Sequence, residues 1–246
     1  MLRAEIEENF NTFEAQWPKE QVAATTAIAP ARNKFIASFV RISSIQAWRV
    51  TLLRDVLDEN SEAFFFEAQN DLLVSHCLAR SGSFRQALKA LRSAIDNVLF
   101  ALYYKDHPVE LQKWELGQHK LNFTELHNYF IGHPALAGVS GSESGLDVLK
   151  TEFGTLSKAV HGSAKQFRMT NKLDEICLWD TDVASVGMWE TREKAVILAM
   201  NYLLAHMFKE QLTGAQRMGL RQAMGLVVPK TRYAYFKATL KITVIG

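Results

Sequence analysis

The sequence has few of the residues that mark disulfide-rich or β-rich domains. Its 246 residues include two cysteines, Cys77 and Cys177, which form no CxxC pair. Two thiols in a chain of this length exclude a disulfide framework and favour a reducing compartment. The low counts of proline (5) and glycine (13) argue against a disordered chain and against a turn-rich β-sandwich.

Long apolar runs are missing as well. No uninterrupted stretch approaches the roughly 18 residues that a membrane-spanning helix needs. The N-terminal stretch MLRAEIEENF is acidic and amphipathic, unlike a signal peptide. Hydrophobic residues make up 48% of the chain and charged residues 22%, which are ordinary globular values. We therefore expect a soluble cytoplasmic protein with no membrane partner.

Acidic residues are absent from one end of the chain. Residues 211–246 contain no Asp or Glu, although the formal net charge of the whole chain is only +2. The basic residues of this segment are Arg217, Arg221, Lys230, Arg232, Lys237 and Lys241. Tyr233 and Tyr235 are interleaved with them. This mixture is typical of RNA or DNA binding, because cations contact phosphates and aromatic rings stack on bases. The alternative is a basic outer helix face followed by aromatic residues that close the core.

Apolar residues recur at helical spacing through most of the chain. Pro18 should end the first helix, and Ser61 is the predicted N-cap of the third. The predicted helices cover residues 2–16, 30–57, 61–80, 84–102, 109–116, 118–136, 146–161 and 189–212, and a continuation of the last one to residue 224 stays open. A short strand or turn is expected near residues 176–179, and alternating β-branched residues after Tyr233 predict an edge strand or an extended tail.

These patterns predict an all-α protein in three parts. Residues 1–60 would form an N-terminal helical extension, residues 61–210 a helical bundle, and residues 211–246 a basic helical or extended tail. The tail would include the short C-terminal strand or extended segment. No repeat of solenoid type is present in the sequence.

One pair of predicted helices resembles a known family. The stretch AQNDLLVSHCLARSGSFRQALKALRSAIDNVLFALYY places an A..DL helix before a short glycine turn, followed by an Ala- and Leu-rich helix with a central acidic residue. The positions that carry the pattern are Ala68, Asp71, Leu72, Gly82, Ala87, Leu91 and Asp96. The pair resembles the opening of a HEPN domain, the helical module of many prokaryotic toxins, defence proteins and RNases. The resemblance implies a HEPN-like bundle and a component of a prokaryotic defence or toxin–antitoxin-like system.

The family's RNases carry an arginine followed, after four to six residues, by a histidine. His161 takes the place of that histidine, but no basic residue lies at the required distance before it. RNA cleavage through the 2′-hydroxyl needs a base or acid near neutral pH and a cation for the developing phosphorane charge. The resemblance therefore implies, as an alternative to a binding subunit, a metal-independent RNase with Lys158, Lys165 or Arg168 as the cation. Whether the chain is an enzyme stays open.

The segment around His161 has two interpretations. Ser157 lies one helical turn before His161, so a hydroxyl and an imidazole can meet there as a catalytic pair, with Lys158 beside them. Alternatively, His161 is the last residue of a helix that ends at Gly162, and its ring bonds the last carbonyl groups.

Metal and cofactor motifs are absent from the sequence. His107, His119, His127 and His133 fall in one stretch, but their spacing matches no zinc motif. The acidic stretch LDEICLWDTD lacks a following lysine at nuclease spacing, and no phosphate-binding loop is present. We expect no metal and no cofactor.

Three consecutive phenylalanines, residues 64–66, point to an interface. On one helix their side chains are about 100° apart, so they cannot all enter the same core. At least one should meet another helix layer or a partner chain. We therefore expect a homo-oligomer or a complex with a partner protein subunit.

Overall fold

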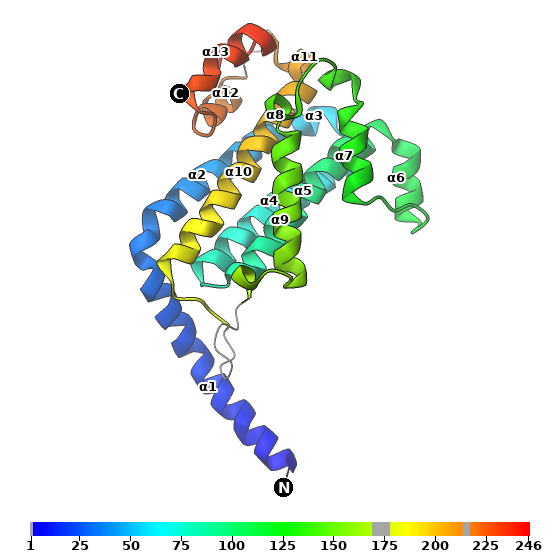
Figure 1. Ribbon diagram of the computed structural model, residues 1–246. Coiled ribbons are helices and arrows are strands. Elements are labelled where there is room, and N and C mark those ends of the chain that lie inside the picture. The colour runs from blue at the N-terminus through cyan, green and yellow to red at the C-terminus, as the bar shows by residue number, and fades with distance from the viewer. Residues whose placement is uncertain (1, 169–177, 214–216) are drawn as a thin grey trace.

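The computed structural model describes residues 2–168, 178–213 and 217–246, and every regular element in these ranges is helical (Figure 1). The predicted all-α class is confirmed. The longer helices are α1 (Leu2–Ile28), α2 (Arg32–Trp48), α4 (Glu59–Arg80), α5 (Phe84–Asp106), α6 (Pro108–Glu115), α7 (Phe123–Ile131), α9 (Leu146–His161), α10 (Val183–Met207) and α12 (Met218–Gly225). The short ones are α3 (Arg54–Val56), α8 (Gly141–Ser144), α11 (Lys209–Leu212) and α13 (Tyr233–Tyr235).

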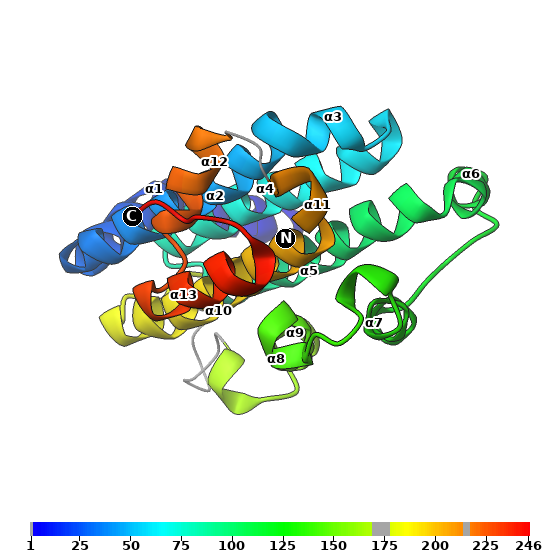
Figure 2. The same ribbon diagram turned by 90° about the horizontal axis from the view of Figure 1, so that it is seen from above.

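The body of the molecule is a bundle in which α10 packs against α2, α5 and α9, while α4 and α5 form a hairpin (Figures 1 and 2). α2 belongs to this body, because its apolar face shares one buried core with the other helices. α1 projects away from it at one end (Figure 1). The buried side chains that fill the centre include Trp48, Phe65, Leu91, Val98, Trp189 and Met200.

Local chemistry sets the α4–α5 hairpin. The N-cap of α4 is Asp58, whose carboxylate accepts the backbone N–H groups of Asn60 and Ser61 at 3.0 Å each. The predicted cap, Ser61, is instead buried in the first turn. Gly82 makes the turn with a φ of 80°, and an added Cβ there would lie 2.5 Å from the carbonyl oxygen of Asp180. Only glycine suits both constraints.

Three predicted helix boundaries are wrong. α1 continues past Pro18 to Ile28. A proline inside a helix removes one backbone N–H group and crowds the preceding turn, which favours a helix end at that point but does not force one. α10 ends at Met207, because Phe208 leaves helical geometry, with φ −111° and ψ 25°. The helix predicted from residue 118 begins at Phe123, where Asn122 and Glu125 form a capping box.

The predicted C-terminal strand is also wrong. Tyr233–Tyr235 and Phe236–Leu240 are helical, and residues 241–246 have no regular secondary structure, as the extended alternative requires. Apolar and polar residues alternate in this segment because Ile242 and Val244 are buried while Lys241 and Thr243 are exposed. Of the strand or turn predicted near residues 176–179, residues 176 and 177 lie outside the described residues, and Leu178 and Trp179 are in neither a helix nor a strand.

The three phenylalanines divide between environments, as predicted. Phe65 is fully buried, and Phe64 packs against the rings of Phe100 and Trp114. Phe66 is 49% exposed, with the Arg49 guanidinium 3.7 Å from its ring centroid.

A buried ion pair joins α2 to α10. Arg41 Nε donates to Glu193 Oε2 at 2.7 Å, and the Glu193 side chain is almost completely buried. Burial raises the pKa of the Glu193 carboxyl, although the Arg41 guanidinium lowers it and the nearby Glu190 adds to the rise. A charge removed from water in this way needs its partner in place.

Two turns further along α10, Asn201 makes a second polar junction with α2. Its side-chain oxygen accepts the indole N–H of Trp48 at 2.9 Å, and its nitrogen donates to Ser44 Oγ at 2.9 Å. Nearer the start of α10, the indole N–H of Trp189 donates to Ser75 Oγ of α4 at 3.0 Å. These buried bonds fix the register of α10 against α2 and α4.

Replacing Glu193 by alanine should lower the free energy of unfolding by about 3–5 kcal/mol, because buried Arg41 would lose its close partner and keep only the longer contact to Glu190, at 3.5 Å. The double change Arg41→Met with Glu193→Leu should recover most of the loss. Urea denaturation followed by circular dichroism measures both. Lys34→Ala is the matched control and should lose about 1 kcal/mol or less, because Lys34 is partly exposed and its partner Glu190 keeps Arg41 as a neighbour. Equal losses in both single variants would contradict the role of the buried pair.

Candidate functional site

α9 ends at His161, as predicted, in a glycine-capped turn. Gly162 has a φ of 60°, its N–H donates to the carbonyl of Ala159, and the N–H of Ser163 donates to the carbonyl of Lys158 at 3.1 Å. This pair of bonds is a Schellman motif, which closes the helix without any side-chain donor. The interpretation of His161 as a helix end is confirmed.

Arg85 of α5 supplies a cation at this turn, and the sequence alone did not predict it. Its Nε donates to the carbonyl of Ala159 at 3.0 Å, and its Nη2 lies 3.4 Å from the carbonyl oxygen of Val160. These are the carbonyl groups that the imidazole of His161 was expected to bond, and that detail is wrong. The His161 side chain is exposed and makes no hydrogen bond to the part of the chain that the structure describes.

Arg168 reaches the same turn, where its Nε donates to the carbonyl of Gly162 at 3.3 Å. Two guanidinium groups, from Arg85 and Arg168, therefore meet the C-terminal end of α9 beside His161. Lys158 and Lys165 are exposed. Both arginines also line a cavity of about 550 Å³ between α5 and α10, together with Asp180, Arg192 and other residues. Asp182 lines it as well, so three guanidinium groups face two carboxylates, and the small net positive charge suits an anionic group.

Ser157 is held by a different partner from the one expected. Its Oγ accepts a hydrogen bond from Arg92 Nε at 3.1 Å and donates to the carbonyl of Phe153 at 2.8 Å. Ser157 is therefore directed toward α5, and no bond to His161 is present among the described residues. The structure does not assemble Ser157, Lys158 and His161 into one hydrogen-bonded group.

Asp96, the acidic residue in the HEPN-like pattern, is bound to Arg92 at 3.3 Å. Burial raises its pKa to about 6; the Arg92 charge opposes that rise, and the Asp71 charge adds to it. The Arg92 guanidinium also lies 4.3 Å above the ring of Phe153. Arg92 thus links Asp96 to Ser157 across α5 and α9, while no described carboxylate contacts His161. A general base at His161 would lack an acidic residue to orient it.

The tyrosines of the C-terminal segment attach it to the body. The Tyr235 hydroxyl lies 3.0 Å from His206 Nε2, and the Tyr233 hydroxyl donates to the carbonyl of Gly225 at 3.0 Å. The Arg232 guanidinium lies over the rings of Tyr202 and Tyr235. Both tyrosine rings are half-buried, so the predicted aromatic surface is largely used inside the chain.

The other basic residues of the segment have few acidic neighbours. Arg217 lies 3.6 Å from Asp55, and Arg221 Nε donates to the carbonyl of Thr243 at 2.6 Å. Lys230, Lys237 and Lys241 are exposed. Within the described ranges, the contact of Arg217 with Asp55 is the one ion pair that the segment makes. The segment therefore presents a positive surface at the end of the molecule opposite α1 (Figure 1).

Three of the four histidines between residues 107 and 133 pack against neighbouring tyrosine rings. His107 stacks on Tyr103 with ring centroids 4.1 Å apart, and His133 Nε2 lies 3.1 Å from Asp106 Oδ2. Across the described residues, no three His, Cys, Asp or Glu side chains converge as metal ligands would. Two members of the acidic stretch, Asp174 and Glu175, fall outside the described residues.

No helix in the described ranges has both the length and the apolar character needed to cross a bilayer. No family model, curated protein or solved structure matches this chain. The geometry of the two basic regions, at the end of α9 and in the C-terminal segment, is therefore the basis for a function.

Replacing Gly162 by alanine should lower the free energy of unfolding by about 1–2 kcal/mol, because a side chain at φ 60° is strained. The new Cβ would also lie 2.9 Å from Arg85 Nη2 and displace the guanidinium. Gly154→Ala is the matched control on the same helix. Nothing lies within 4 Å of a Cβ there, so this change should stabilise the protein by about 0.5–1 kcal/mol. Thermal melts of both variants test the prediction, and effects of the same sign would contradict it.

Proposed function

We propose that this protein is a HEPN-like helical binding and assembly subunit of a prokaryotic defence or toxin–antitoxin-like system, and that it binds RNA or DNA through residues 217–241. The defence role rests on the resemblance of the α4–α5 hairpin to HEPN domains. The nucleic-acid role rests on the uncompensated positive charge of the C-terminal segment. Assembly with itself or with a partner protein is supported by the exposed apolar side chains described below.

The single observation that carries the binding role is the scarcity of acidic partners in this segment. Its six basic side chains have one ion pair among the described residues, to Asp55, which is itself largely exposed. Displacement of counterions from a phosphate backbone favours binding to such a surface, and the contact is independent of base sequence. Because the rings of Tyr233 and Tyr235 are half-buried, we assign the contact to the cations Arg217, Arg221, Lys230, Lys237 and Lys241 rather than to base stacking.

The double variant Lys230→Glu, Lys237→Glu should bind labelled single-stranded RNA at least about 10-fold more weakly at low salt. The slope of log affinity against log salt should become shallower by about 1.4, because each lost phosphate contact removes about 0.7. Fluorescence anisotropy over a salt series measures both values. Lys113→Glu with Lys120→Glu, which are exposed lysines outside the segment, is the matched control and should keep more of the affinity. Wild-type affinity that does not change with salt would contradict the proposal.

A second candidate function is metal-independent RNA cleavage at His161. It is favoured by one observation, the meeting of Arg85 and Arg168 at the turn beside His161. Such guanidinium groups stabilise phosphorane charge, and an exposed imidazole can act as a base or an acid. Arg85 would then take the role of the arginine in the family motif, although the motif's arginine lies only a few residues before the histidine and Arg85 comes from another helix. Ser157 and Lys158 are not part of this arrangement.

Incubation of end-labelled RNA with the wild type in EDTA should leave the RNA intact if the chain is a binding subunit. Cleavage by the wild type that is lost in His161→Ala and in Arg85→Ala would favour the RNase and contradict a purely binding role. His119→Ala is the control histidine variant. His119 contacts Tyr104, about 28 Å along α5 from Arg85 at 1.5 Å per residue, so its removal should not change cleavage.

A further inference from the structure

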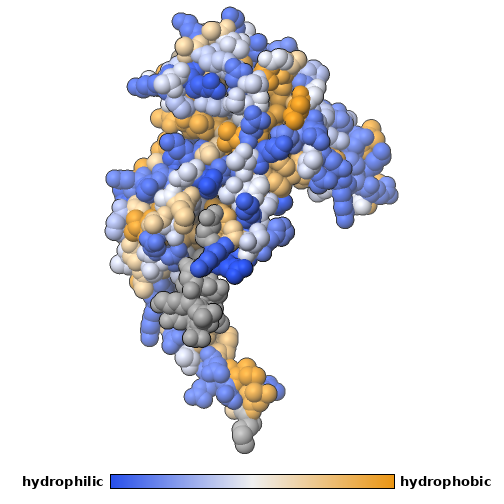
Figure 3. Space-filling view, in the orientation of Figure 1, coloured by the Kyte–Doolittle hydropathy of each residue, from blue (hydrophilic) through white to orange (hydrophobic). Residues whose placement is uncertain are grey.

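The projecting part of α1 carries an apolar stripe with no partner in the described chain along most of its length. Its members recur every three or four residues and are 45–70% exposed: Leu2, Ile6, Phe10, Phe13 and Trp17. At 100° per residue the stripe continues along the same helix face into Ala24 and Ile28, which are buried against the body. Trp17 makes an edge contact with Trp179, but the outer residues extend beyond the bundle (Figures 1 and 3). Large exposed side chains in a row mark a binding face.

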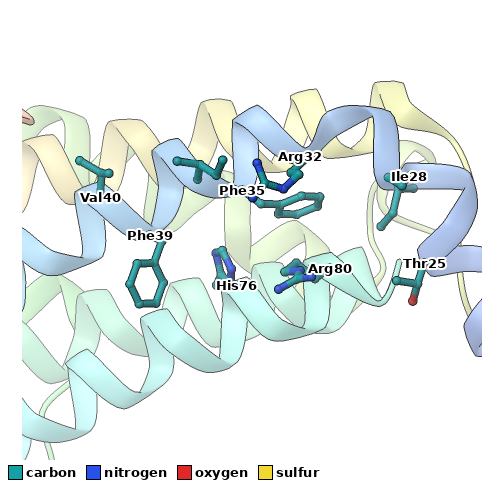
Figure 4. Close-up of a pocket in the computed structure, with 10 residues that line it drawn as sticks. Thr25, Ile28, Arg32, Phe35, Phe39, Val40, His76 and Arg80 are labelled. Atoms are coloured by element: carbon teal, nitrogen blue, oxygen red, sulfur yellow. The ribbon is translucent and has the colours of Figure 1, made fainter.

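A groove that suits such a helix lies on the face of the α2–α4 pair. It has a volume of about 420 Å³, and its exposed apolar walls include Ile36 (44%) and Phe39 (57%). Figure 4 shows Phe39 and His76 directed into the space between the two helices, with Arg32 and Arg80 on opposite sides nearer to α1. Further along α4, Val74 and Phe66 are also exposed, at 38% and 49%.

We propose that this groove binds α1 of a second copy of the chain. Charge favours that occupant. Residues 2–20 contain five glutamates and two basic residues, whereas the groove contains Arg32 and Arg80, neither of which makes an ion pair within the described part of the chain. Glu7 and Glu14, seven residues apart, lie on one edge of the stripe. Direct pairing of α1 with α1 would bring two acidic helices together instead.

Length and position agree with a reciprocal dimer. The projecting residues 2–20 span about 27 Å, and α4 from Phe66 to Arg80 spans about 21 Å, at 1.5 Å per residue. Thr25 and Ile28, at the end of α1, line the groove of their own chain. Each α1 therefore leaves its body at one end of its own groove, so two copies can exchange their α1 helices about a two-fold axis. Such a contact closes as a dimer, with two identical helix-in-groove interfaces.

This inference develops the assembly part of the proposed function and is independent of nucleic-acid binding. It predicts that the full chain is a dimer in solution by sedimentation equilibrium. Ile6→Ser with Phe10→Ser on α1, and Ile36→Ser with Phe39→Ser in the groove, should each raise the dimer dissociation constant by about 100-fold or more, because each change acts twice in a two-fold dimer. All four side chains are exposed, so both variants should fold with wild-type helicity.

A mixture of the two variants distinguishes docking in the groove from pairing of α1 helices. One variant keeps an intact groove and the other an intact α1, so the mixture should form a heterodimer with one interface. A charge test adds a second measurement: Glu7→Lys with Glu14→Lys should weaken the dimer, and Arg32→Glu with Arg80→Glu in the same chain should restore it. A monomeric wild type, or a groove variant that remains a dimer, would overturn the inference. RNA binding by a monomeric wild type would leave the proposed function standing.

Discussion

The buried carboxylate of Glu193 constrains the whole bundle. A carboxylate removed from water requires a cation at hydrogen-bonding distance, and Arg41 is the residue that meets it. This requirement holds α2 against α10 in one register, in which Asn201 can also bond Trp48 and Ser44. α2 therefore belongs to the core, and the chain before it leaves from the edge of the body as the projecting helix α1.

The same packing determines the chemistry at the end of α9. α5 lies against α9 so that Arg85 and Arg92 face it one above the other, seven residues apart. Arg85 bonds the terminal carbonyls of α9, and Arg92 bonds Ser157 and Asp96. The side-chain hydrogen bonds of Arg85 and Arg92 thus hold α5 against α9, while His161 remains exposed beside them. Among the described residues, His161 therefore lacks the neighbouring group that ordinarily orients a catalytic imidazole.

Charge is separated along the molecule. The acidic residues of α1 lie at one end and the basic C-terminal segment at the other, with the bundle between them (Figure 1). Such a separation allows one end to associate with protein while the other binds a polyanion. The proposed dimer would place α1 on the α2–α4 face and leave the C-terminal segment open, so that assembly and nucleic-acid binding do not compete for one surface.

Local sequence determined the features whose causes are local. Apolar periodicity and the dipeptide His161-Gly162 placed the end of α9 correctly, because a left-handed glycine caps a helix wherever the helix lies. Local signals were insufficient at Pro18, where the helix continues, and after Tyr233, where burial of alternate residues resembles a strand. Only the tertiary structure brought Arg85 to α9 and Arg41 to Glu193. The partners in each of these contacts are far apart in the chain, and their distance in space depends on the packing of whole helices rather than on any spacing within one of them.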